Sequence, residues 1–163
     1  MAFRLPKACR QFFDEIVTTG SAGRSEENKF IWFDAYYLCL LVGLSKSKIS
    51  PDPSLLESGD FIDNYPEPYI GSRDYIAGLL IATEADRLGI IKEDANALQK
   101  LMLHYVDYES PNRLSKFGID TLNQYAARGA EVIRDTLSGK PSSLEVFIRE
   151  YFIHFETGNF LQS

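Results

Sequence analysis

The sequence predicts an all-α fold: a single globular domain over residues 1–163, with about six helices around a buried central helix and one long proline-containing loop. Apolar residues recur three and four positions apart along most of the chain, which is the spacing of one helix face. Glycine, proline and serine cluster between these segments and mark their ends. Of the 163 residues, 45% are hydrophobic and 13% are aromatic, values that are typical of one packed domain.

The stretch 72–89, SRDYIAGLLIATEADRLG, is predicted to be the central helix. Ser72 and Asp74 suit the exposed N–H groups of a helix start. Residues 75–82 are apolar on every side, which is typical of a helix enclosed by its neighbours. Gly89 is expected to end the helix in the left-handed conformation.

Two helices are predicted before this one. The first covers residues 7–18, after Pro6, whose missing N–H costs nothing in a first helical turn. The second covers residues 25–43. Its aromatic and aliphatic side chains would also suit a buried strand, but strands seldom exceed about ten residues, so its length favours a helix. Asp34 is the charge within its apolar run, and we expect it to face outward or to pair with an arginine.

Residues 44–70 are predicted to form a long loop that contains four prolines, with short helical turns at 53–57 and 61–65. The prolines stiffen the segment 65–69, YPEPY. We expect this segment to be a lid whose tyrosines pack over the central helix. A ligand clamp is the alternative, because binding residues concentrate on loops.

Three further helices are predicted, at residues 92–108, 114–137 and 142–160. The short link between the helices at 72–89 and 92–108 should make them an antiparallel hairpin. Small residues in the helix at 114–137 permit the close approach of a neighbouring helix. They are Ala126, Ala127, Gly129 and Ala130.

Charge and composition narrow the classes of function. The net charge of −6 works against a dedicated nucleic-acid-binding protein, which normally has a basic surplus. Cys9 and Cys39 fall inside predicted helices, and we expect buried free thiols, with a disulfide as the alternative. The first residues lack the apolar core of a secretory signal, and no segment reaches the roughly 18 apolar residues of a membrane span. We therefore expect a soluble cytoplasmic protein.

The sequence contains no catalytic, metal-binding or cofactor-binding motif: no HExxH, GxSxG or CxxC, no phosphate loop and no dinucleotide fingerprint. Glu84 lies three residues before Arg87, and an ion pair is the simpler interpretation of this spacing than a general acid or base. His104 and Asp107 share a helix face but need further ligands to hold a metal. No catalytic residue and no cofactor are therefore predicted.

The segment 29–43, KFIWFDAYYLCLLVG, the Tyr-Pro segment after it and residues 76–90, IAGLLIATEADRLGI, carry a resemblance. Together they resemble the small helical accessory proteins of bacterial DNA-phosphorothioation and other phage-defence gene clusters. The resemblance covers the middle third of the chain and includes no catalytic residues. It implies a non-enzymatic subunit of a larger DNA-processing or defence assembly, although the acidic charge departs from what direct DNA contact requires.

The leading functional hypothesis is a protein-binding subunit or adaptor, or a homo-oligomer, without enzymatic activity. The predicted helix at 142–160 has more apolar surface than one core-facing stripe requires, and exposed apolar patches usually mark interfaces. Candidate interface residues are Val146, Arg149, Ile153 and Phe160.

Two alternatives remain. The first is a small-ligand binder or enzyme with a pocket between the central helix and the segment 65–69. Its candidate lining residues are Tyr65, Tyr69, Arg73, Tyr75 and Glu84. The second is a DNA-associated module that uses the basic spot of Lys46 and Lys48. Further basic residues that could join this spot are Arg4, Lys7 and Arg10.

Overall fold

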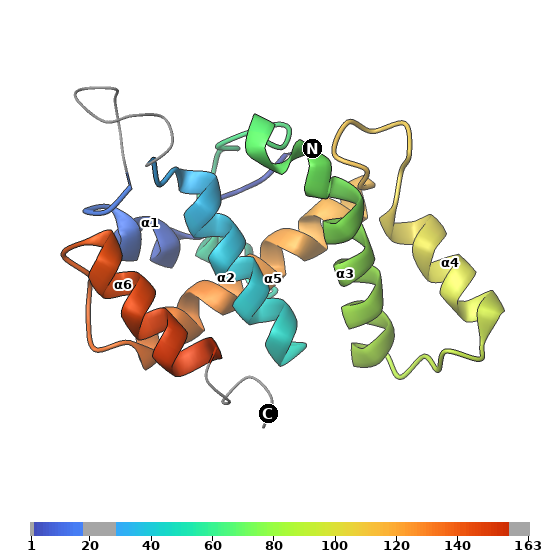
Figure 1. Ribbon diagram of the computed structural model, residues 1–163. Helices are drawn as coiled ribbons and strands as arrows, with labels where there is room; N and C mark the ends of the chain where they lie inside the picture. The colour runs from blue at the N-terminus through green and yellow to red at the C-terminus, as the bar shows by residue number, and fades with distance from the viewer. Residues whose placement is uncertain (1, 18–28, 157–163) are drawn as a thin grey trace.

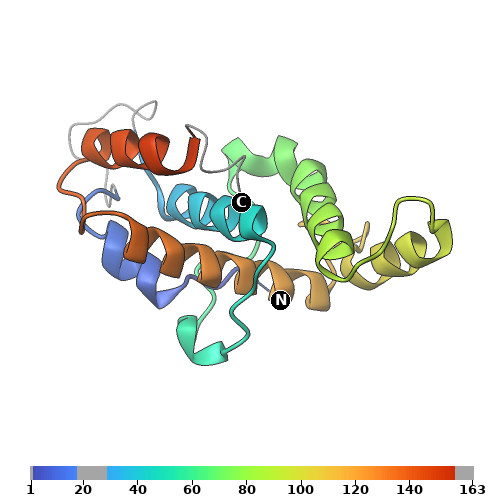
Figure 2. The ribbon, with the colours of Figure 1, turned by 90° about the horizontal axis from the view of Figure 1, so that it is seen from below.

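The computed structural model describes residues 2–17 and 29–156 and confirms the predicted all-α fold, since these residues form helices and no named strand. The centre of the fold is the crossing of α2 (Trp32–Lys46) and α5 (Lys116–Thr136), which form the most extensive helix pair. Figure 1 shows α2 crossing α5 in the middle of the molecule, and Figure 2 shows the two helices next to each other. Most of the buried side chains gather around this pair.

Glycine permits the close contact between α2 and α5. A methyl group at Gly129 of α5 would overlap the backbone carbonyl of Cys39, and one at Gly43 of α2 would overlap the carbonyl of Tyr125. The prediction that small residues of this helix allow the close approach of a neighbour is therefore confirmed. Cys9 and Cys39 are buried free thiols, as predicted, and burial raises the pKa of the Cys9 thiol.

The prediction that the helix at 72–89 is the central one is wrong. The corresponding helix, α3 (Arg73–Arg87), buries five of its 15 residues, whereas α5 buries 11 of its 21. Tyr75 of α3 is 62% exposed. A buried central helix exists, but it is α5, because α5 is the helix that α1, α2 and α4 all contact.

Two short helices cover one end of the central pair. Helix α1 (Lys7–Phe13) is shorter than the predicted 7–18, and α6 (Leu144–Tyr151) continues into one turn of π-helix, η4 (Phe152–Glu156). Phe147 of α6 packs edge-on against Phe13 of α1, with ring centroids 4.8 Å apart. The parts of the predicted helices and connector that fall in residues 18–28 and 157–160 lie outside the described residues.

Helix α2 begins at Trp32, later than the predicted residue 25, because the chain is extended at Ile31. There Asp34 accepts a hydrogen bond from the Ile31 N–H at 2.8 Å. Its other oxygen accepts one from the Tyr69 hydroxyl. The carboxylate is thus a helix cap and a loop anchor, in place of the expected outward charge or arginine pair.

The predicted long loop is present, and it pairs with the N-terminal segment. The predicted turn at 53–57 corresponds to η2 (Pro53–Leu55). The one predicted at 61–65 is absent, because the Phe61 N–H donates to the Phe3 carbonyl and the Phe3 N–H donates to the Ile62 carbonyl, both at 3.0 Å. The second helical turn is instead η3 (Glu67–Ser72), which leads directly into α3.

Helices α3 and α4 (Ala95–Tyr105) form the predicted hairpin, at the opposite end of the molecule from α6 (Figure 1). Gly89 has a φ of 73°, which confirms the predicted left-handed stop between them. Helix α4 lies at the edge of the fold, where it contacts α3 and α5. In the described part of the chain, no helix combines the length and apolar character needed to cross a membrane.

Candidate functional site

Glu84, on α3, is the charged group most completely enclosed by the fold. Its side chain has no exposed surface, and each of its two oxygens accepts two hydrogen bonds. Arg87 donates from Nε at 2.8 Å and from Nη2 at 2.7 Å. The hydroxyls of Tyr105 and Tyr125 donate at 2.6 and 2.5 Å. The carboxylate therefore joins α3 to α4 and α5.

The electrostatics of this cluster keep Glu84 ionised. Burial alone would raise its pKa, but the hydrogen bonds from Arg87, Tyr105 and Tyr125 outweigh it and hold the pKa below the usual carboxylate value. Burial and the adjacent carboxylate raise the pKa of Tyr105 to about 12. The predicted Glu84–Arg87 ion pair is confirmed, but its carboxylate is buried rather than on the surface. Both oxygens of Glu84 are occupied by the four hydrogen bonds from Arg87, Tyr105 and Tyr125. We therefore interpret the cluster as a structural junction between the three helices.

The structure does not bring the other candidate ligand residues to Glu84. Tyr65 is buried against Phe3 and Phe33, and its hydroxyl has no hydrogen-bond partner in the described residues. Tyr69 donates its hydroxyl to Asp34 and lies against Phe33, so the segment 65–69 packs on α2 rather than over the helix at 72–89.

The remaining two candidates, Arg73 and Tyr75, lie on the first turn of α3. Arg73 donates from Nη1 to the Pro111 carbonyl at 3.4 Å, and Tyr75 is largely exposed. The structure has a pocket beside α3, but it is not the predicted one between α3 and the segment 65–69. None of the five predicted lining residues contributes to it.

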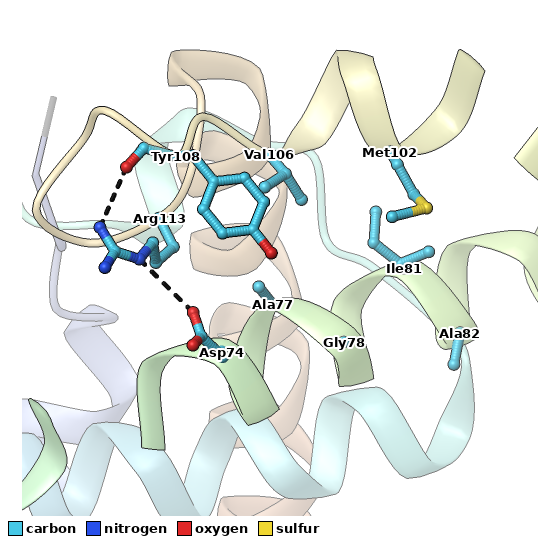
Figure 3. Close-up of a pocket in the computed structure, with 9 residues that line it drawn as sticks. All are labelled: Asp74, Ala77, Gly78, Ile81, Ala82, Met102, Val106, Tyr108 and Arg113. Carbon is cyan, nitrogen blue, oxygen red and sulfur yellow. Dashed lines mark hydrogen bonds and ion pairs between the residues drawn. The ribbon is translucent and has the colours of Figure 1, made fainter. Parts of the chain in front are cut away.

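A different pocket lies on the other side of α3, between α3 and α4 (Figure 3). It has a volume of about 260 Å³, and its walls are mainly apolar. Three elements contribute: α3, α4 and the turn that follows α4. The lining residues are Asp74, Ala77, Gly78, Ile81, Ala82, Met102, Val106, Tyr108 and Arg113.

One end of this pocket is charged. Arg113 has a φ of 66°, and its Nη1 donates to the Tyr108 carbonyl at 3.0 Å, which holds the guanidinium in place. Its Nε lies 3.5 Å from an oxygen of Asp74, which is longer than a good hydrogen bond. Sequence reasoning missed this site because Asp74, Met102 and Arg113 are far apart in the chain and no motif links them.

The predicted interface residues of α6 and η4 lie on the surface. Val146 is 37% and Ile153 54% exposed, and Arg149 is exposed on α6 between them. Two further apolar side chains, Ile148 and Phe152, are about half exposed. Phe160 lies outside the described residues.

The candidate basic residues do not all serve as free surface charges, because two of them bind an acidic residue of the long loop. Arg4 and Arg10 both bind Glu57, the first at its carbonyl oxygen and the second at its carboxylate. Lys46 lies in the last turn of α2, Lys48 is exposed just beyond it, and neither forms an ion pair within the described residues.

No group of three or more histidine, cysteine, aspartate or glutamate side chains could hold a metal ion in the part of the chain that the structure describes. The His104 ring lies tilted by 37° against the ring of Phe117, with centroids 4.0 Å apart.

No protein-family model, no curated protein and no solved structure matches this chain.

Proposed function

We propose that this protein is a non-enzymatic, protein-binding subunit whose main contact surface is the outer face of α6 and η4. One observation carries the proposal: four large apolar side chains on these two consecutive elements are between 37% and 55% exposed. They are Val146, Ile148, Phe152 and Ile153.

The exposed apolar side chains of α6 and η4 are not needed for folding, because the opposite face of the helix supplies its contacts with the core. Phe147 and Tyr151 of α6 and Phe155 of η4 are buried and follow one another at four-residue intervals. This stripe, together with the partly buried Leu144, attaches the helix to the core. Contiguous exposed apolar area of several hundred Å² is uncommon on monomeric proteins and usually marks an interface.

Arg149 lies on the same exposed surface and suits such a role. Arginine combines an apolar stem with a forked donor group and is enriched where protein interfaces carry most of their binding energy. The resemblance to accessory proteins of DNA-phosphorothioation and phage-defence clusters supports a partner within such an assembly.

A two-armed experiment tests this proposal. The tagged wild-type protein and the double variant Val146→Glu, Phe152→Glu are purified from the native host, and each is also examined by sedimentation equilibrium. We expect the wild type to self-associate or to recover a defined partner. Because interface anchors carry most of the binding energy, we expect the double variant to weaken that association by roughly tenfold or more.

Leu103→Glu is the matched control, because Leu103 is a large apolar residue of α4 that is 74% exposed and lies outside the proposed surface. The control should leave the association unchanged. A wild-type protein that stays monomeric and recovers no stoichiometric partner would refute the proposal. So would a double variant that associates as well as the wild type.

A further inference from the structure

The pocket between α3 and α4 combines an apolar trough with a pair of opposite charges at one end, and it is not used by the proposed protein-binding surface. In Figure 3, Ile81 and Met102 face each other across the trough, and Asp74 and Arg113 lie together at its far end. An occupant of this pocket has to match both parts.

The trough favours an apolar group of limited size. Ala77, Gly78 and Ala82 form its floor on α3, and Met102 and Val106 form the facing wall. Few polar atoms line it, so water held there makes few hydrogen bonds, and an apolar group gains about 25 cal/mol for each Å² that it removes from water. The volume of about 260 Å³ suits a small molecule rather than a large cofactor.

The charged end retains binding capacity for both signs of charge. Arg113 uses Nη1 for the carbonyls of Tyr108 and Ser110, but neither Nε nor Nη2 donates a hydrogen bond within the described residues. The Asp74 side chain is 73% exposed, and its contact with Arg113 is the loose one at 3.5 Å. A ligand whose anionic group binds Arg113 and whose cationic group binds Asp74 would therefore disrupt only a weak contact between these two side chains.

The proximity of the two charges decides which ligands fit. Asp74 repels an isolated anion that approaches Arg113, and Arg113 repels an isolated cation that approaches Asp74. A zwitterion meets both requirements, because its carboxylate accepts from Arg113 while its ammonium donates to Asp74.

We propose that this pocket binds a free α-amino acid with an aliphatic or thioether side chain. The ammonium and carboxylate on one carbon pair with Asp74 and Arg113, and the side chain enters the trough between Ile81 and Met102. The Tyr108 ring, whose hydroxyl points over the trough in Figure 3, covers the ligand.

Calorimetric titration of the full-length protein with L-leucine and L-methionine tests the proposal. Three probes each lack one feature: N-acetyl-L-leucine lacks the ammonium, L-leucinamide lacks the carboxylate, and glycine lacks the apolar side chain. We expect L-leucine or L-methionine to bind at least tenfold more tightly than every one of these probes. If the acetylated or amidated probe binds equally well, as a chain terminus would, the amino-acid proposal is wrong.

Variants locate the binding. Asp74→Asn should weaken the affinity for the amino acid at least tenfold, and Gly78→Leu, which fills the trough, should abolish binding. Gly78 has no heavy atom within 4 Å of an added Cβ, so this variant should still fold, and a thermal unfolding curve verifies that it does. Asp86→Asn, an exposed carboxylate on the same helix, is the control and should bind as the wild type does.

Unchanged affinity in Gly78→Leu, or no detectable binding of either amino acid up to about 10 mM, would overturn the proposal. These outcomes are independent of the α6 surface, because neither the probes nor the variants touch it.

Discussion

Glu84 is the residue through which three helices meet, and its energetics follow from its surroundings. Removing a carboxylate from water costs several kcal/mol, and the attraction to one cation does not by itself repay this cost. Here two hydrogen bonds from Arg87 and one from each of Tyr105 and Tyr125 satisfy both oxygens. Arg87 keeps about a third of its side chain in water, so only the carboxylate is fully desolvated.

Replacing Glu84 by alanine should be strongly destabilising. The change leaves the hydroxyls of Tyr105 and Tyr125 without their acceptor, and each buried donor that loses its partner costs about 1–3 kcal/mol. The more conservative Tyr105→Phe removes a single hydrogen bond to a charged group and should cost about 1.5–3 kcal/mol. Urea unfolding measures both free energies. An alanine variant no less stable than Tyr105→Phe would contradict this interpretation of the cluster.

The same residue predicts how stability depends on pH. Because the pKa of Glu84 is lower in the folded protein than the usual value of 4.5, its contribution is fully present above that value. The contribution is lost as the pH falls from 4.5 through the folded-state pKa. The stability difference between the wild type and Glu84→Gln, measured by urea unfolding, should therefore shrink below this pH. A difference that stays constant down to pH 3 would show that the Glu84 carboxylate is not preferentially ionised in the folded state.

Local spacing predicted only part of this cluster. Glu84 and Arg87 are three residues apart on one helix, so their pairing follows from helical geometry. Tyr105 and Tyr125 lie on two other helices, and nothing local in the sequence indicates that their hydroxyls reach Glu84. Asp34 shows the same limit, since its capping role depends on where the helix starts and its second partner, Tyr69, is 35 positions away.

At the scale of elements, the crossing of α2 and α5 depends on two glycines. Gly43 and Gly129 each lie against a carbonyl group of the opposite helix, so no side chain fits at either position. Glycine weakens an isolated helix by roughly 0.5–1 kcal/mol relative to alanine. The close packing of the two central helices compensates for this intrinsic cost.

Alanine substitution at these glycines should therefore destabilise the protein. We expect Gly129→Ala to cost more than about 2 kcal/mol, because the backbones of α2 and α5 have to separate. Gly78→Ala, in α3, meets no atom within 4 Å and should instead stabilise the protein by up to about 1 kcal/mol. Thermal unfolding of the three proteins gives the comparison. Equal midpoints for the two variants would mean that the contact is not as close as described.

Helix positions were largely predictable from periodicity and from glycine and proline breaks, but the identity of the central helix was not. The run at 75–82 has an apolar residue at every position, yet its exposed members include glycine and alanine, which lose little in water. Helix α5 has charged residues along its length and still supplies the buried centre: 11 of its 21 residues are buried, and α1, α2 and α4 all contact it. Burial depends on the partner surface, which the local sequence does not contain.

For the whole molecule, the described residues form a core at one end and a hairpin at the other. Helices α1, α2 and α5 contact one another, α6 packs on them through Phe147, and α3 and α4 attach beside this core (Figures 1 and 2). The α6 surface could be anticipated, because its surplus apolar residues all lie within eight positions of the sequence, 146–153. The α3–α4 pocket could not, because its polar end is made by residues from two distant segments.

This organisation predicts that the hairpin opens before the core. Helix α4 buries two of its 11 residues, Leu101 and Tyr105, whereas α5 buries 11 of 21. Local opening costs less where fewer apolar contacts are broken, so amides of α4 should exchange with solvent at least about tenfold faster than those of α2 and α5. Hydrogen–deuterium exchange read by mass spectrometry measures this order directly. In Tyr105→Phe, the hydroxyl that ties α4 to Glu84 is absent, so α4 should lose further protection while α2 keeps its own. Equal protection of α4 and α5 would mean instead that the hairpin and the core unfold as one unit, and the α3–α4 pocket would then be as rigid as the core beside it.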